Sequence, residues 1–131
     1  MRIHRRLIDS IVAHAIEGRP AECCGVLIGN DEEIVEAVRS PNLSPDPNRY
    51  ELDPKVHIDA RRSARERALR VVGFYHSHPH SAATPSSADL AEAAYPDAVY
   101  LIVGLEPGNQ PDVRLFSITA ERVVEIAMDL E

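Results

Sequence analysis

Residues 71–89 read VVGFYHSHPHSAATPSSAD, and the fold and the chemistry that we predict both follow from this segment. Its first six residues, from Val71 to His76, form an apolar run that is typical of a buried strand. In an extended chain, residues i and i+2 point to the same side, so His76 and His78 converge on one point. Pro79 ends strand pairing there. Both imidazoles therefore lie at the carboxyl end of the strand, facing a loop.

Asp89 lies in the first turn of a short helix that we expect to begin at Ser86, over SSADLAEAAY. The preceding loop can fold back and bring Asp89 to the two imidazoles as a third metal ligand. Zinc accepts imidazole nitrogen and carboxylate oxygen at about 2.0–2.2 Å, and three protein ligands leave a fourth position for water. Iron or manganese could occupy such a site too. Ser86 and Asp89 also match a helix-capping pattern, and we expect the nearby His80 to be solvated.

These residues together match the pattern H-x-H-P-x6-S-x2-D at every fixed position. The chance of such a match in a chain of this length is about one in ten thousand or less. The segment resembles the JAMM (MPN+, Mov34/PAD-1) family of zinc isopeptidases, of the compact prokaryotic type. That family also has a glutamate on an earlier strand, followed by a small pair such as Cys-Gly. Glu22 stands in that place in PAECCGVL, residues 20–27, and the resemblance covers roughly residues 20–104.

The resemblance implies a role for each residue. His76, His78 and Asp89 would hold one zinc ion per chain. Glu22 would be the general base that takes a proton from the zinc-activated water and passes it to the leaving amine; the alternative is an exposed glutamate at the start of a strand. Ser86 would donate a hydrogen bond to the oxygen of the tetrahedral intermediate, but its hydroxyl is equally suited to cap the helix.

The rest of the chain predicts strands mixed with helices in a single α/β or α+β domain spanning residues 1–131. We expect helices over residues 1–18 and from 54 to about 69, and strands over residues 24–29, 33–38, 71–76, 98–104, 113–118 and 122–128. The resemblance implies a JAMM/MPN-like fold with cytidine-deaminase-like layering, in which a curved mixed β-sheet is flanked by helices.

Composition excludes several classes of protein. The 131 residues carry 14 Lys+Arg against 21 Asp+Glu, a formal net charge of −7, and 44% are hydrophobic, as in a globular chain. The longest apolar run, Ala98 to Leu105, is far shorter than the roughly 20 residues of a membrane-spanning helix. The acidic balance disfavours nucleic acid as a partner. The amino-terminal stretch has an apolar stripe at helical spacing, so we expect a first helix rather than a targeting peptide, and a cytoplasmic protein.

Two further sequence features have ordinary explanations. Cys23 and Cys24 are adjacent, so a bridge between them would be strained, and we expect two small buried hydrophobic side chains in a reducing compartment. Five arginines lie between residues 61 and 70, interleaved with acidic residues. We expect a solvated helix face there, and the alternative is a docking stripe for an acidic protein partner.

The resemblance also implies a substrate. We expect hydrolysis of the bond after the C-terminal Gly-Gly of a ubiquitin-like or sulfur-carrier protein, by a monomer or homodimer, for deconjugation or for release of a C-terminal residue such as cysteine. The alternatives are a non-catalytic MPN-fold interaction module, a RadC-like DNA-associated protein, a zinc deaminase, and a cysteine protease using Cys24 with His76. The metal residues are all retained, which argues against the non-catalytic module. The negative charge argues against a DNA-associated protein, and the lack of a P-C-x-x-C pair argues against a zinc deaminase.

Overall fold

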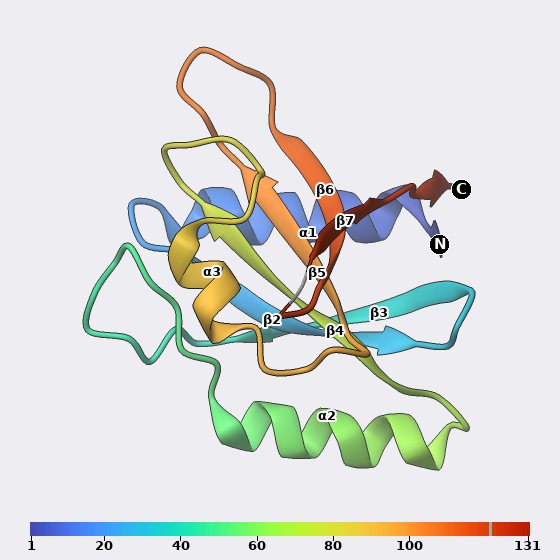
Figure 1. Cartoon of the computed structure of the whole chain (residues 1–131). Coiled ribbons are helices and arrows are strands. Elements are labelled where there is room, and N and C mark those ends of the chain that lie inside the picture. The colour runs from blue at the N-terminus through green and yellow to red at the C-terminus, as the bar shows by residue number, and fades with distance from the viewer. Residues whose placement is uncertain (121) are drawn as a thin grey trace.

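The computed structural model describes residues 1–120 and 122–131, and these form eight strands and three helices (Figure 1). The helices are α1 Arg5–Gly18, α2 Pro54–Glu66 and α3 Ser87–Glu92. The strands are β1 Arg2–Ile3, β2 Cys24–Gly29, β3 Glu33–Ser40, β4 Arg70–His78, β5 Val99–Gly104, β6 Asp112–Ile118, β7 Val123–Ile126 and β8 Asp129–Leu130. All eight strands belong to one sheet, in the order β7-β6-β5-β4-β2-β3-β1-β8.

Strand β4 lies in the interior of this sheet and is paired on both sides. It runs antiparallel to β2, with Cys24 opposite His76, and parallel to β5, with Gly104 opposite His78. The pairs β5–β6 and β6–β7 are antiparallel, whereas β1 runs parallel to both β3 and β8. The sheet is therefore mixed and flanked by helices, which confirms the predicted fold class.

Each face of the sheet has its own hydrophobic core, and α1 covers one face while α2 lies against the other (Figure 1). Strand residues alternate between the two faces. Tyr75 packs in the core beneath α1, whereas its neighbour Phe74 packs in the core beneath α2. By the same alternation, His76 and His78 share a face with Phe74 and point to the side of the sheet that carries α2.

The predicted helices begin and end differently in the structure. The first helix starts at Arg5 rather than residue 1, because Arg2–Ile3 pairs with two other strands. The second ends at Glu66 rather than near residue 69. Leu69 N–H donates back to the carbonyl of Ala64, which closes the helix end. The third is limited to Ser87–Glu92, and beyond it the N–H of Tyr95 donates to the Tyr100 hydroxyl instead of a helical carbonyl.

Each predicted strand corresponds to a strand of the structure, which has two further strands, β1 and β8, that were not predicted. β4 reaches His78, two residues beyond the prediction, because β5 pairs with it to its end. β3 extends to Ser40 in the same way, through its pairing with β2. The predicted terminal hairpin is present as β6 and β7. β1 and β8 have two residues each, so they are too short to produce a periodic pattern in the sequence.

Gly25 in β2 permits the close packing of the central strands. A side chain at this position would overlap the ring of Tyr75 and the carbonyl oxygen of Val38. Tyr75 is only 1% exposed, and its hydroxyl lies 2.7 Å from His14 Nδ1, so the ring has no free space to move into. The strand therefore requires glycine here for lack of room.

We predict that Gly25→Ala lowers the free energy of unfolding by about 1–3 kcal/mol, the usual cost of overpacking a core. In a strand without this steric clash, alanine would be more stabilising than glycine. A decrease in the free energy of unfolding therefore identifies the clash. Urea unfolding measures it. Gly18→Ala is the matched control, because a Cβ there makes only an ordinary contact with Cys23. Equal stability of the Gly25→Ala variant and the native protein would contradict the packing described.

Candidate metal centre

The last residues of β4 bring two imidazoles to one point. His76 and His78 are 1% and 6% exposed, and their ring centroids are 5.2 Å apart. Pairing of β4 with both neighbours fixes the backbone that carries them. The loop after Pro79 then passes tightly over the end of β5, because a side chain at Gly104 would overlap the backbone of residues 81–83.

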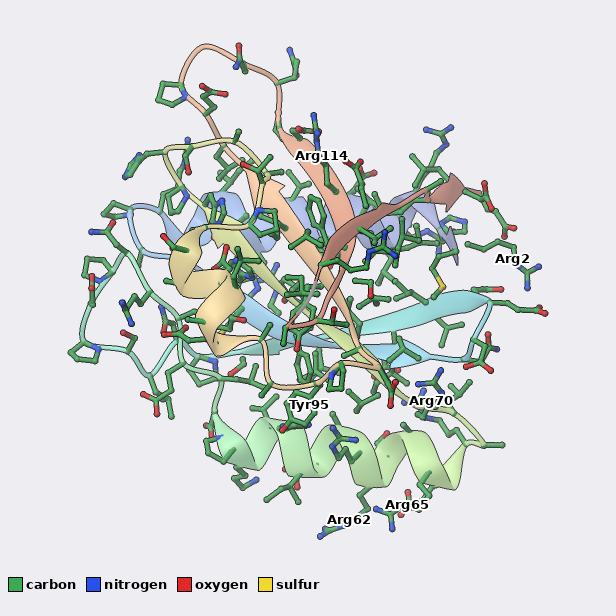
Figure 2. All side chains as sticks on the ribbon, in the orientation of Figure 1. Arg2, Arg62, Arg65, Arg70, Tyr95 and Arg114 are labelled. Carbon is green, nitrogen blue, oxygen red and sulfur yellow. The ribbon has the colours of Figure 1, made fainter. Side chains whose placement is uncertain are left out.

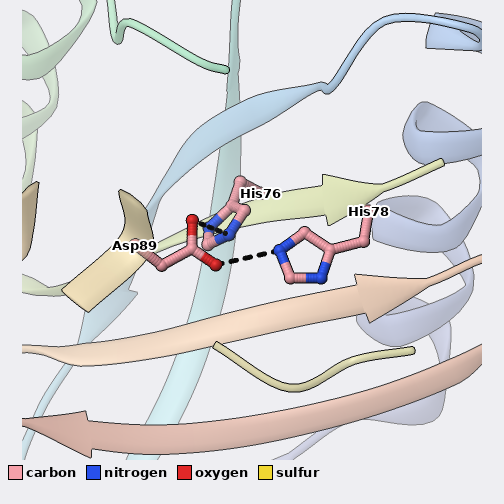
Figure 3. A group of neighbouring side chains, drawn as sticks. All are labelled: His76, His78 and Asp89. Atoms are coloured by element: carbon pink, nitrogen blue, oxygen red, sulfur yellow. Dashed lines mark hydrogen bonds and ion pairs between the residues drawn. The ribbon is translucent and has the colours of Figure 1, made fainter. Parts of the chain in front are cut away.

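Asp89 faces both imidazoles from the start of α3 (Figure 3). Its Oδ1 lies 3.1 Å from His76 Nε2, and its Oδ2 lies 2.9 Å from His78 Nε2. A capping box holds the carboxylate in place: Ser86 N–H donates to Asp89 Oδ2 at 2.9 Å, and Asp89 N–H donates to Ser86 Oγ at 3.1 Å. Burial alone would raise the pKa of Asp89, but the two histidines and the Ser86 N–H hold it well below its usual range.

The hydrogen bond on the far side of His78 selects its tautomer. His78 Nδ1 lies 2.8 Å from the carbonyl oxygen of Ala82. A carbonyl only accepts, so Nδ1 carries the proton, and in the neutral ring the lone pair is on Nε2, which faces Asp89. Burial lowers the pKa of His78, but the hydrogen bonds to Asp89 and Ala82 outweigh it and the pKa is raised. Histidine ligands of metals are commonly oriented by such a bond.

The three side chains fit a metal ion. Among the described residues, His76, His78 and Asp89 form a group whose ligand atoms all lie within 4.8 Å of one another. Ligand atoms of a tetrahedral zinc site lie about 3.3 Å apart, given bonds of 2.0–2.1 Å. His76 Nε2 is close to Asp89 but lacks the alignment of a hydrogen bond. In the described part of the chain, both ring nitrogens of His76 and Glu22 Oε1 are the buried side-chain atoms without a hydrogen-bond partner. Such unsatisfied atoms need an explanation, and a bound ion supplies one for Nε2 of His76, the nitrogen that lies beside Asp89.

Glu22 lies beside this group because β2 is tied to the end of β4. Ser77 N–H donates to the carbonyl of Cys23 at 3.1 Å, and Cys23 N–H donates to Ser77 Oγ at 2.8 Å. Continuing the β2–β4 register by two residues sets Glu22 opposite His78. Burial raises the pKa of Glu22 to about 7, and the nearby His78 opposes that rise. A carboxyl with a pKa near neutrality is suited to general base catalysis.

Tyr50 is a site residue that the sequence did not indicate. Its ring stacks on His76, with centroids 4.5 Å apart and an angle of 19° between the rings. Burial raises the pKa of the Tyr50 hydroxyl above its ordinary value, so the hydroxyl remains protonated. A cavity of about 350 Å³ lies next to this ring and is lined mainly by aromatic side chains, with Glu92 at its wall.

The other predicted site residues are placed as follows. Ser86 is the N-cap of α3, and its Oγ accepts the Asp89 N–H, so its hydroxyl hydrogen stays available to donate. His80 is exposed, as expected. Cys23 and Cys24 are buried free thiols. Burial raises the pKa of Cys24 to about 12, so it is not a thiolate at neutral pH and does not suit the nucleophile of a cysteine protease.

The arginines between residues 61 and 70 are only partly paired. Arg67 contacts Glu36 at 2.8 Å, and Arg70 contacts Asp31. Arg62 and Arg65 project from α2 away from the sheet (Figure 2), which is the arrangement of a solvated face. Within residues 1–120 and 122–131, none of the helices is both long and apolar enough to cross a membrane.

Comparison with known proteins agrees with this geometry. Residues 4–119 match the model of a family described as prokaryotic homologues of the JAB domain. A desampylase from Haloferax volcanii is 41% identical over 101 residues, which cover 72% of this chain and 73% of that protein. A CysO-cysteine peptidase from Mycobacterium tuberculosis is 30% identical over 125 residues, 94% of this chain and 86% of that protein.

Solved structures show the same fold. Protein DSY2949 from Desulfitobacterium hafniense superposes with a TM-score of 0.89 at 28% identity, over 99% of this chain and 92% of the other. A JAB1/MPN domain protein from Archaeoglobus fulgidus, AF2198, superposes with a TM-score of 0.67 at 20% identity, over 99% and 98%. The expected resemblance to JAMM proteins is confirmed. The chain belongs to the family of prokaryotic homologues of the JAB domain, and it is a peptidase of the JAMM class.

Proposed function

We propose that this protein is a zinc-dependent peptidase that hydrolyses the bond after the C-terminal Gly-Gly of a ubiquitin-like or sulfur-carrier protein. The reaction would remove a conjugated protein or release a C-terminal residue such as cysteine. The observation that carries the proposal is the buried group of His76, His78 and Asp89 beside the carboxyl group of Glu22, whose Oε1 has no hydrogen-bond partner among the described residues. This set provides three ligands and a separate base, the composition of an open catalytic site.

The chain's own residues supply the remaining chemistry. A zinc ion held by these ligands would act as a Lewis acid and make a water molecule nucleophilic at neutral pH. Glu22 would accept the proton of the attacking water at its carboxylate and then give it to the leaving amine. The Ser86 hydroxyl, which has its hydrogen free, would donate to the developing oxyanion. The His78 Nδ1–H bond to Ala82 would keep the His78 ring in its ligating orientation.

The substrate class is supported by two observations of different kinds. The two relatives described above are named a desampylase and a CysO-cysteine peptidase. In addition, the aromatic cavity beside Tyr50 offers an apolar surface to residues that flank the two glycines. The glycines themselves need no side-chain pocket, so they can lie against the crowded metal group.

We predict close to one zinc ion per chain in protein purified without chelator, and little zinc in Asp89→Ala. The substitution removes a ligand that contacts both histidines. Elemental analysis by mass spectrometry measures the content. The control is Asp97→Ala, which removes an exposed carboxylate that follows α3 in the sequence and should leave the zinc content unchanged. A native protein that holds no zinc, even after zinc is added back, would rule out the proposed peptidase.

We predict cleavage after the second glycine of fusions that end in Gly-Gly followed by cysteine or by a short peptide. Glu22→Gln should lower kcat at least about 100-fold while zinc content is unchanged, because the general base is lost and the ligands are not. Mass spectrometry of the products identifies the bond that is cleaved, and steady-state kinetics give kcat. Glu66→Gln, on the exposed face of α2, should retain full activity. Zinc-loaded protein that cleaves no such fusion would contradict the proposed substrate.

The raised pKa of Glu22 also predicts how the metal-free protein responds to pH. Folding raises this pKa from its ordinary value of 4.5 to about 7, so the native state prefers the protonated carboxyl and loses stability as the pH rises through this range. Glu22→Gln should therefore stabilise chelator-treated protein at pH 8 by about 1–3 kcal/mol, less than the full pKa shift implies, because solvent screens part of the carboxyl group. The two proteins should be equally stable at pH 4. Urea unfolding at both pH values measures the difference, and a difference that does not change with pH would contradict the burial of Glu22.

A further inference from the structure

Asn42 uses its whole side-chain amide to join three separate backbone segments. Its Nδ2 donates to the carbonyl of Glu22 at 2.9 Å and to the carbonyl of Arg49 at 2.9 Å. Its Oδ1 accepts from the N–H of Ser44 at 3.0 Å and from the N–H of Glu51 at 2.9 Å. An amide side chain has two donor hydrogens and two acceptor lone pairs. All four are used here.

Two of these bonds enclose Tyr50. Asn42 binds the carbonyl of the preceding residue, Arg49, and the N–H of the following residue, Glu51. The backbone on both sides of Tyr50 is therefore fixed to one amide. The Tyr50 ring, in turn, stacks on the imidazole of His76. Asn42 therefore binds the backbone on both sides of the residue whose ring stacks on His76.

The same amide fixes the backbone of Glu22. The carbonyl of Glu22 accepts from Asn42, and its N–H donates to the carbonyl of Pro47 in the same loop at 2.9 Å. Glu22 precedes β2, and the β2–β4 pairing begins only at Cys24. Its backbone is therefore held by the loop that Asn42 organises and, one residue later, by the bonds between Cys23 and Ser77.

We propose that Asn42 is a positioning residue: it holds the Glu22 carboxylate in register with the metal ligands, through a loop whose backbone it also fixes on both sides of Tyr50. The inference rests on the proposed function for its effect on catalysis. A simple loop-forming role would need only the local bond to Ser44, the Asx-turn typical of asparagine. The bonds to Glu22 and to both sides of Tyr50 reach 20, 7 and 9 residues along the chain, and they link the loop to the site.

The variant Asn42→Asp removes the two hydrogen bonds that Asn42 donates and keeps the two that it accepts. The aspartate is nearly isosteric and keeps an oxygen for the N–H groups of Ser44 and Glu51. Its second oxygen replaces the donor amide and faces the carbonyls of Glu22 and Arg49, which it repels. Asn48→Asp is the matched control, because it places the same charge at an exposed position in the same loop. Thermal unfolding and zinc content establish that each variant is folded and loaded, and Asn42→Ala replaces Asn42→Asp in every measurement if the latter does not fold.

The decisive measurement is a double-mutant cycle with Glu22→Gln, in zinc-loaded enzyme on a Gly-Gly fusion. Displacing a catalytic group by about 1 Å can lower the rate on the order of 100-fold. We expect Asn42→Asp to lower kcat at least tenfold with KM within twofold, and to change the residual kcat of Glu22→Gln by less than twofold. Asn48→Asp should leave kcat unchanged. An equal loss in both backgrounds, or no loss in the native background, would overturn the proposal.

Amide hydrogen exchange tests the same proposal without activity. Asn42→Asp should speed exchange of the Glu22 N–H at least tenfold, because the loop that accepts this hydrogen bond is released, whereas Asn48→Asp should not. Unchanged protection of Glu22 in Asn42→Asp would overturn the positioning role. If the native enzyme cleaves none of the fusions, the proposed function fails, and exchange still decides whether Asn42 holds Glu22.

Discussion

The alternation of side chains along the paired end of β4 is the constraint on which the rest of the site depends. The alternation places His76 and His78 on the face of the sheet beneath α2. Ser77, between them, hydrogen-bonds to the backbone of Cys23. One strand end therefore supplies two of the proposed metal ligands and also fixes the segment before β2 that contains Glu22. Because β4 is paired on both sides, this arrangement is rigid before any substrate arrives. Preorganisation of this kind is what catalysis by positioned groups requires.

The surroundings of the two carboxylates of the site shift their pKa values in opposite directions. Asp89 is buried among donors and histidines, and its pKa is held low, so it remains ionised, which is the form that binds a metal ion. Glu22 is buried without a hydrogen-bond partner on Oε1, and its pKa is raised toward neutrality. Such divergence allows two groups of one chemical type to take a ligand role and a base role at the same pH. The unpartnered Glu22 also costs stability, a common feature of functional sites.

Local pattern and motif spacing predicted the central strands and the group of His76, His78 and Asp89, whereas the mixed sheet flanked by helices was predicted from the family resemblance. The strands and this group depend on short-range alternation and on one loop, which the sequence encodes directly. Tyr50 and Asn42 could not be predicted, because their roles arise from hydrogen bonds between segments far apart in the chain. The two-residue strands β1 and β8 were missed for a related reason. They exist because the chain ends meet at the sheet edge, where Asp129 N–H donates to the carbonyl of Met1.

The capping box at the start of α3 has an evolutionary consequence. The Asp89 carboxylate accepts the Ser86 N–H while it faces the two histidines, so one side chain caps the helix and also belongs to the proposed metal site. A descendant that abandoned catalysis by replacing Asp89 would also weaken the start of a six-residue helix. Loss of His76 or His78 carries no such penalty for α3. A lineage that discards the histidines would therefore keep the cap of α3, but it would leave the buried Asp89 carboxylate without two of the groups that hold its pKa low.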